Sequence, residues 1–122
     1  MSTSSVENYL EAILVLSKKR PVVRSIDIAN YLGYSKSSVS IAVKHLREQD
    51  LAYMTDEGFL YLTEKGNAIA ASIYDRHSFF AHWLTSLGVD KDTAEEDACK
   101  MEHAISAKSF SAIKKAIESQ EK

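Results

Sequence analysis

Three side chains in the second half of the chain could together bind a metal ion. They are Cys99, Glu102 and His103, and their spacing of i, i+3 and i+4 places them on one face if the segment is helical. A thiolate, a carboxylate and an imidazole gathered on one face can coordinate a first-row transition metal. Short polar clusters on helices are usually solvated, so the meaning of this triplet depends on the elements around it.

The first half of the chain has the sequence form of a helix-turn-helix. A capping box at Ser4–Glu7 predicts a first helix that runs to about Lys19. A short helix over residues 25–32 and a serine-rich helix over residues 36–49 are predicted on either side of a turn at Gly33. A short helix, a glycine-containing turn and a second helix in this order are typical of DNA-binding proteins.

A β-hairpin is predicted directly after the third helix. Two apolar runs, Leu51–Met54 and Phe59–Leu62, are separated by the turn-rich segment Thr55–Gly58. A hairpin in this position is the wing of a winged helix, and the combination is much more specific than either part alone. We therefore predict a mainly α fold in which residues 1–63 form a winged helix-turn-helix DNA-binding domain.

The start of the third helix carries the residues expected to bind DNA. The segment from Lys18 to Arg47 is basic, since Asp27 is its only acidic residue. Small hydroxyl side chains at a helix N-terminus can donate to phosphates, and lysine and arginine add charge contacts. Ile41 could contact a thymine methyl group, although the serines could instead only cap the helix and Ile41 could instead pack. The predicted DNA-binding residues are Ser35, Lys36, Ser37, Ser38, Ser40, Ile41, Lys44 and Arg47.

Residues 64–122 are predicted to form a helical dimerisation and metal-binding domain. A long helix opens at Thr63–Gly66 and continues towards Leu87, a second spans Asp90–Ala104, and Ser106 caps a last helix. Three helices are too small a set to bury a convincing core alone. We therefore expect their apolar faces to pack against a second copy of the chain, which gives a homodimer.

The composition excludes several other classes of protein. Of the 122 residues, 45% are hydrophobic and 26% are charged, and the net charge of −2 excludes a uniformly basic nucleic-acid coat. No run approaches the roughly 18 apolar residues needed to span a membrane, and the N-terminus lacks the regions of a secretory signal. A single cysteine excludes an intrachain disulfide framework. We therefore expect a cytoplasmic protein with no membrane partner.

The order of these elements, with the motifs they carry, resembles the diphtheria toxin repressor family of iron- and manganese-dependent transcriptional regulators. The most specific motifs are Leu62–Gly66, Arg76 with His77, and Cys99–Ser106, and the similarity spans residues 6–117. The resemblance implies a homodimeric repressor of metal-uptake genes that binds a palindromic DNA operator. The chain ends before the SH3-like domain that many iron-branch members carry, so we expect no ligands from such a domain.

The resemblance also implies a set of metal ligands, position by position. Cys99 matches the thiol of the iron branch, whereas Glu11 matches a carboxylate that the manganese branch uses. Asn8 stands where relatives have aspartate or methionine, and its amide oxygen is a further candidate ligand. The residues that match positions shared by both branches are His77, Glu102 and His103.

The donor set bears on which metal binds. Two carboxylates, two imidazoles and one thiolate suit Fe(II), with Zn(II) or Co(II) as competitors in vitro. Manganese prefers oxygen ligands and has the lowest affinity in the divalent series, so Cys99 weighs against Mn(II), while Glu11 points to the manganese branch. The sequence therefore leaves Fe(II) and Mn(II) as alternatives, with one ion or two.

The expected mechanism is a metal-dependent switch in DNA binding. We expect a bound ion to connect the first helix, through Glu11, to the helices that carry the other ligands. This connection would fix the spacing of the two recognition helices in the dimer.

An alternative is a winged-helix regulator that does not use metal and is either constitutive or senses redox conditions through Cys99. A hydrolytic metal centre is a third possibility, but the sequence has no glycine-rich substrate loop or nucleophile motif, so we predict no enzymatic activity. A protein-interaction module would bind no DNA with or without metal.

Overall fold

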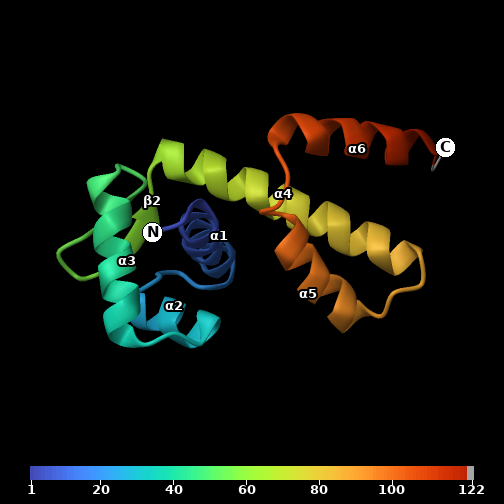
Figure 1. Cartoon of the computed structure of the whole chain (residues 1–122). Helices are drawn as coiled ribbons and strands as arrows, with labels where there is room; N and C mark the ends of the chain where they lie inside the picture. The colour runs from blue at the N-terminus through green and yellow to red at the C-terminus, as the bar shows by residue number, and fades with distance from the viewer. Residues whose placement is uncertain (121–122) are drawn as a thin grey trace. The chain divides into compact units, whose positions relative to one another are not determined.

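The computed structural model describes residues 1–120, and the chain divides into two compact units (Figure 1). The first unit spans Met1–Ser72 and the second begins at Ile73. Residues 121–122, which the sequence analysis assigns to the second domain, lie outside the described residues. None of the described helices is long and apolar enough to cross a membrane. The elements in chain order are α1 (Thr3–Lys19), α2 (Ser25–Leu32), α3 (Lys36–Glu48), β1 (Ala52–Met54), β2 (Leu60–Leu62), α4 (Glu64–Ser86), α5 (Lys91–Met101) and α6 (Ala107–Gln120).

The first unit is a winged helix-turn-helix. The helices α1, α2 and α3 surround a core that contains Leu10, Ile28 and Leu46, each fully buried. The sequence of α3 explains its packing, because the apolar residues 39, 43 and 46 recur at helical intervals and are all buried. Gly33 ends α2 with a φ of 73°, a left-handed conformation that glycine adopts without a steric penalty. The predicted winged helix and mainly α fold are confirmed.

The wing is the antiparallel pair of β1 and β2. Tyr53 pairs with Tyr61 at its centre, and Ala52 pairs with Leu62. Ala52 is buried, whereas both tyrosines are exposed and their rings stack with centroids 5.5 Å apart. Side chains alternate between the faces of a strand, so this register gives the wing an apolar inner face and an aromatic outer face.

Helix α1 begins earlier than the sequence pattern indicates. Ser2 is its N-cap, because the Ser2 Oγ atom accepts a hydrogen bond from the amide of Ser5 at 3.2 Å. Ser4 lies inside the first turn, so the predicted capping box at Ser4–Glu7 is wrong. Several serines at the start of the chain offer similar caps, and the earlier one satisfies a free amide while lengthening the helix.

The motif Leu62–Gly66 packs the start of α4 against the backbone that precedes the wing. The Thr63 hydroxyl donates to the Asp50 carbonyl at 2.7 Å, and the Thr63 amide donates to the Leu51 carbonyl at 3.1 Å. Gly66 approaches the Leu51 carbonyl so closely that a Cβ atom at this position would lie 1.9 Å from the oxygen. Only glycine fits there, which explains its place in the motif.

The second unit consists of the rest of α4 together with α5 and α6. Phe80, Ala98 and Phe110, one from each helix, are buried in a shared cluster. The rings of Phe80 and Phe110 meet edge to face with centroids 5.6 Å apart, a favoured geometry for aromatic pairs. Ser106 caps α6 as predicted, since its Oγ atom accepts a hydrogen bond from the Ser109 amide. A small aromatic core therefore sets the positions of the three helices.

Asp90 fixes the start of α5. Its carboxylate accepts hydrogen bonds from the amide and the hydroxyl of Thr93, each at 3.0 Å. The amide hydrogen bond, and after it the hydroxyl hydrogen bond, hold the pKa of Asp90 below its ordinary value because both favour the ionised carboxylate. This cap fixes the residue at which the acidic helix α5 begins.

Candidate metal centre and nucleic-acid interface

Glu102 and His103 lie in the turn that follows α5, where the sequence predicts a continuing helix. The helix ends at Met101, and Glu102 is its C-cap. The carbonyl of Glu102 accepts a hydrogen bond from the side chain of Arg76 at 3.1 Å rather than one from a further turn of helix. The prediction that this helix runs through Ala104 is therefore wrong.

A buried carboxylate stands between two histidines at this turn. Glu102 is fully buried, and its Oε2 atom lies 2.9 Å from Nδ1 of His77 on α4. Its Oε1 atom makes no hydrogen bond within the described residues. The Nε2 atom of His103 lies 3.2 Å from that oxygen, which is within ion-pair distance but without hydrogen-bond alignment. Two predicted ligands, His77 and His103, therefore converge on the carboxylate of a third, Glu102.

This arrangement fits a divalent metal ion. An ionised carboxylate that is buried without compensation costs roughly several kcal/mol, so it calls for a cation partner. The Glu102 oxygen that lacks a hydrogen bond has lone pairs to give, and a neutral imidazole offers one ring nitrogen as a ligand. Carboxylate and imidazole together suit Mn(II), Fe(II) and Zn(II). The second unit therefore brings together one carboxylate and the two imidazoles of the donor set that the sequence predicted.

Glu95 on α5 is a member of this cluster that the sequence analysis did not identify. Its Oε2 atom lies 2.5 Å from Nε2 of His77, so the imidazole stands between two carboxylates. A neutral imidazole has one N–H and donates to only one of them, whereas the protonated ring donates to both. Glu95 precedes Cys99 by one helical turn and Glu102 by two. That spacing along one helix face is the signal that could have identified it.

Cys99 is exposed in the last turn of α5. In the part of the chain that the structure describes, its thiol belongs to no group of three or more candidate ligand atoms within 4.8 Å of one another. The role of Cys99 as a metal ligand therefore stays a prediction.

Asn8 and Glu11 belong to the first unit. They lie one turn apart on α1, so they share a face of this helix, and both are half-buried. Leu10 between them is fully buried and anchors the helix in the core of the unit. The packing of α1 therefore gives the amide and the carboxylate a common face.

The exposed face of α3 is the candidate nucleic-acid interface. All eight residues predicted to bind DNA are exposed, whereas Val39, Val43 and Leu46 of the same helix are buried. Ile41 is 69% exposed, which excludes the alternative that it packs in the core of this unit. An isoleucine so exposed on this helix is available to a thymine methyl group.

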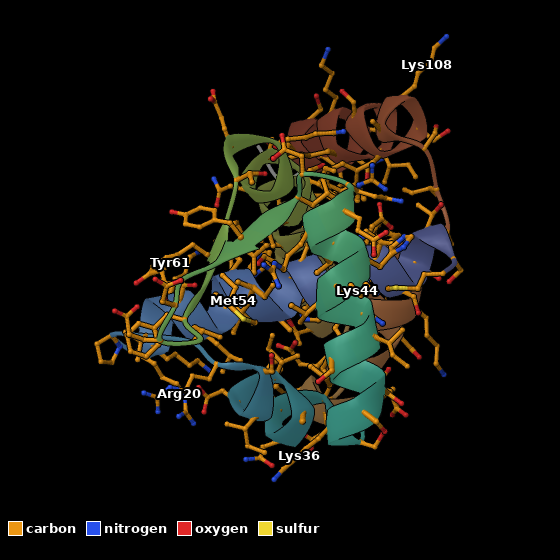
Figure 2. The ribbon with its side chains drawn as sticks, turned by 90° about the vertical axis from the view of Figure 1, so that its left-hand side faces the viewer. Arg20, Lys36, Lys44, Met54, Tyr61 and Lys108 are labelled. Atoms are coloured by element: carbon orange, nitrogen blue, oxygen red, sulfur yellow. The ribbon has the colours of Figure 1, made fainter. Side chains whose placement is uncertain are left out.

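The N-terminus of α3 combines capping with positive charge. Ser35 is the N-cap, since its Oγ atom accepts a hydrogen bond from the amide of Ser38 at 3.2 Å. Figure 2 shows Lys36 at this end of the helix and Lys44 about two turns further along, with Tyr61 on the wing. The helix dipole adds partial positive charge at the same end. The surface therefore suits contact with phosphate groups.

Comparison with known families assigns both halves of the chain. Residues 1–58 match the family described as "Iron dependent repressor, N-terminal DNA binding domain". Residues 63–122 match the family described as "Iron dependent repressor, metal binding and dimerisation domain". Together with the fold, these matches define a metal-dependent transcriptional regulator and not an enzyme.

The chain belongs to the iron-dependent repressor family. An uncharacterised HTH-type transcriptional regulator of Methanocaldococcus jannaschii is 38% identical over an alignment of 109 residues that covers 85% of each chain. The HTH-type transcriptional regulator MntR of Bacillus subtilis is 34% identical over 114 residues, which are 93% of this chain and 80% of that protein. The resemblance inferred from the motifs is therefore confirmed.

Solved structures show the same fold. The manganese regulator SloR superposes with a TM-score of 0.81 at 29% identity, and a manganese-dependent transcriptional repressor in complex with manganese does so with a TM-score of 0.82 at 27% identity. Each alignment covers 93% of this chain. The chain spans 53% and 52% of the length of those two chains.

Proposed function

We propose that this chain forms a homodimer that represses metal-uptake genes when Fe(II) or Mn(II) is bound. The observation that carries the proposal is the buried Glu102 carboxylate, which has one oxygen without a hydrogen bond and lies beside two imidazoles. The protein would act in the cytoplasm, on the genes that it controls. The proposed ligands are Glu11, His77, Cys99, Glu102 and His103, with Asn8 as a further candidate.

The donor set is compatible with either metal. Carboxylates favour Mn(II), whereas the thiolate of Cys99 shifts the preference towards Fe(II) and, in vitro, towards Zn(II) or Co(II). When bound, the ion supplies one centre of positive charge that several side chains share. A family described as iron-dependent and a relative described as a manganese regulator support both metals as candidates.

Ligands from both units explain how DNA binding would depend on metal. Glu11 belongs to the unit that carries α3, whereas the other ligands belong to the unit that begins at Ile73. Sharing one ion would restrict the first unit relative to the second, in both copies of a dimer. The switch requires that metal binds more tightly to the DNA-competent state than to the other.

The target is then a palindromic DNA operator. A dimer with two recognition helices binds half-sites about 10 bp apart, or a multiple of that spacing. Lys36, Lys44 and Arg47 would contact phosphates, and Ile41 would contact a thymine methyl group. The hydroxyl groups that would donate to phosphates belong to Ser35, Ser37, Ser38 and Ser40.

The test compares two glutamates of α1. Glu11→Gln removes the charged ligand proposed for the first unit, and Glu7→Gln alters a glutamate of the same helix that is not a proposed ligand. Binding to an operator selected from a DNA library is measured with and without Mn(II) or Fe(II). We expect Glu11→Gln to lose most of the metal-dependent increase in affinity and Glu7→Gln to keep it. An unchanged metal response in Glu11→Gln would show that the two units do not share the ion.

A further inference from the structure

Arg76 is a buried cation next to the candidate metal centre. It precedes His77 on α4 and is 8% exposed. Its Nη1 atom donates to two main-chain carbonyls, that of Glu102 at 3.1 Å and that of Ile105 at 2.8 Å. The guanidinium carbon lies 5.7 Å from the centroid of the Phe110 ring. The side chain of Arg76 therefore binds the backbone of the turn between α5 and α6.

The contact between Arg76 and Glu102 provides a hydrogen-bond donor at the C-terminal end of α5. The last carbonyls of a helix have no partner within the helix and carry partial negative charge. Arg76, which lies on α4, provides both a hydrogen-bond donor and a positive charge to the carbonyl of the C-cap Glu102. The Nε atom of Arg76 has no hydrogen-bond partner among the described residues. The two carbonyl contacts therefore both come from Nη1 of this buried guanidinium.

Two consecutive side chains of α4 hold the same turn in different ways. His77 contacts the carboxylate of Glu102, whereas Arg76 binds the main chain on both sides of His103. Both partners of the contact between His77 and Glu102 are proposed ligands, so a bound ion would compete for the lone pairs of these side chains. The hydrogen bonds from Arg76 involve no ligand atom.

We propose that Arg76 is a positioning residue of the metal centre, which keeps Glu102 and His103 beside His77 whether or not an ion is present. The inference rests on the proposed function, because it assumes that these three residues are ligands. Partners that orient metal ligands typically contribute 10- to 100-fold to metal affinity. Arg76 would exert this effect through the backbone of the turn.

The experiment measures Mn(II) affinity of the full chain by electron paramagnetic resonance of the free ion. Arg76→Met removes the donors and the charge at similar length, and Arg76→Lys keeps the charge and some donors. Lys114→Met is the matched control, because it breaks the 3.3 Å ion pair with Asp75 on α4 without touching the turn. All titrations are made where circular dichroism shows the metal-free variant to be fully folded. We expect about 10- to 100-fold weaker binding for Arg76→Met, an intermediate loss for Arg76→Lys and no change for Lys114→Met.

A second readout does not involve metal. Amide hydrogen exchange over residues 103–106 of the metal-free protein should be faster in Arg76→Met and unchanged in Lys114→Met. Should Arg76→Met fail to fold, both readouts apply to Arg76→Lys, which should bind Mn(II) more weakly than the wild type. Wild-type affinity in a folded Arg76 variant would overturn this inference alone. Absence of Mn(II) and Fe(II) binding in the wild-type chain would overturn the proposed function and this inference together.

Discussion

At the scale of single residues, the site is organised around one carboxylate that the fold has removed from water. Glu102 is fully buried, and one of its oxygens has no hydrogen-bond partner among the described residues. A hydrophobic residue of similar size would be cheaper to bury, so the carboxylate makes sense as a ligand held ready for a cation. His77 and His103 complete the immediate surroundings.

Replacing Glu102 tests this view of the residue. Glu102→Gln keeps the shape of the side chain but removes its charge, so metal affinity should fall by more than about 100-fold. The metal-free variant should remain folded, because a glutamine amide can still hydrogen-bond to His77. Isothermal titration with Mn(II) measures the affinity, and circular dichroism checks the fold. The exposed neighbour Glu96 provides the control Glu96→Gln, and full metal affinity in Glu102→Gln would contradict the assignment.

The sequence predicted part of this site for physical reasons. Glu102 and His103 were predicted because they follow Cys99 at helical spacing in the sequence. His77 was predicted from the family motif. Glu95 was missed, and no role was predicted for Arg76, because their contacts join helices far apart in the sequence. Periodicity along a helix describes which residues share a face, but it does not give the partner of that face.

At the scale of elements, local chemistry decides where helices begin, end and approach one another. The apolar periodicity of α3 and the turn at Gly33 were sufficient to predict the helix-turn-helix. Helix ends were less predictable, because a cap or a distant side chain competes with another turn of helix. The cap at Ser2 lengthens α1 at its N-terminus. At the end of α5, Arg76 donates to the Glu102 carbonyl, which would accept a main-chain hydrogen bond if the helix continued.

Gly66 tests the close approach between α4 and the chain before the wing. Alanine normally favours a helix, but here its Cβ atom would lie 1.9 Å from the Leu51 carbonyl oxygen. We expect Gly66→Ala to reduce the free energy of unfolding by about 1–3 kcal/mol or more, as overpacked sites do. Urea unfolding measures the change. Asn67→Ala at the next, exposed position should change stability by less than about 0.5 kcal/mol, and a Gly66→Ala protein as stable as wild type would refute the steric argument.

Asp90 tests the cap of α5 through pH. Its pKa is lowered in the folded chain by the Thr93 hydrogen bonds, so its contribution to stability is present above the ordinary aspartate pKa and is lost as pH falls through the folded value. Thermal unfolding of metal-free Asp90→Asn should therefore depend less on pH than that of wild type between about pH 5 and pH 2. Equal pH dependence of the two proteins over this range would count against the cap.

At the scale of the whole molecule, function depends on joining a DNA-binding unit to a metal-binding and dimerisation unit. The composition and the order of motifs were sufficient to predict this pairing, and the family matches agree with it. In the proposed function, the number of ions and the choice between Fe(II) and Mn(II) would depend on which of the proposed ligands bind the same ion. Glu11 and Glu102 are far apart in the chain, so the sequence alone does not predict the distance between their carboxylates.

The proposed dimer makes a quantitative prediction about salt. Each phosphate contact lowers the slope of log K against log salt concentration by about 0.9, and a dimer makes every contact twice. Lys44→Gln should therefore make the slope less steep by about 1.8. Lys108→Gln, on α6 outside the proposed DNA surface, should leave it unchanged. Fluorescence titrations of an operator at several salt concentrations provide the slopes, and equal slopes for Lys44→Gln and wild type would remove Lys44 from the interface.

The proposed function requires that metal binding and DNA binding are coupled in this chain. The most direct measurement is an anaerobic titration of the metal-free protein with Fe(II) and with Mn(II), while binding to a fluorescent DNA library is followed at fixed salt. We predict that at least one of the metals tightens DNA binding by about 5- to 150-fold, the usual range of coupling between two sites. Enhancement by Fe(II) at lower free concentration would assign Cys99 a selecting role. DNA affinity that is the same with and without either metal would show that the two binding events are not coupled.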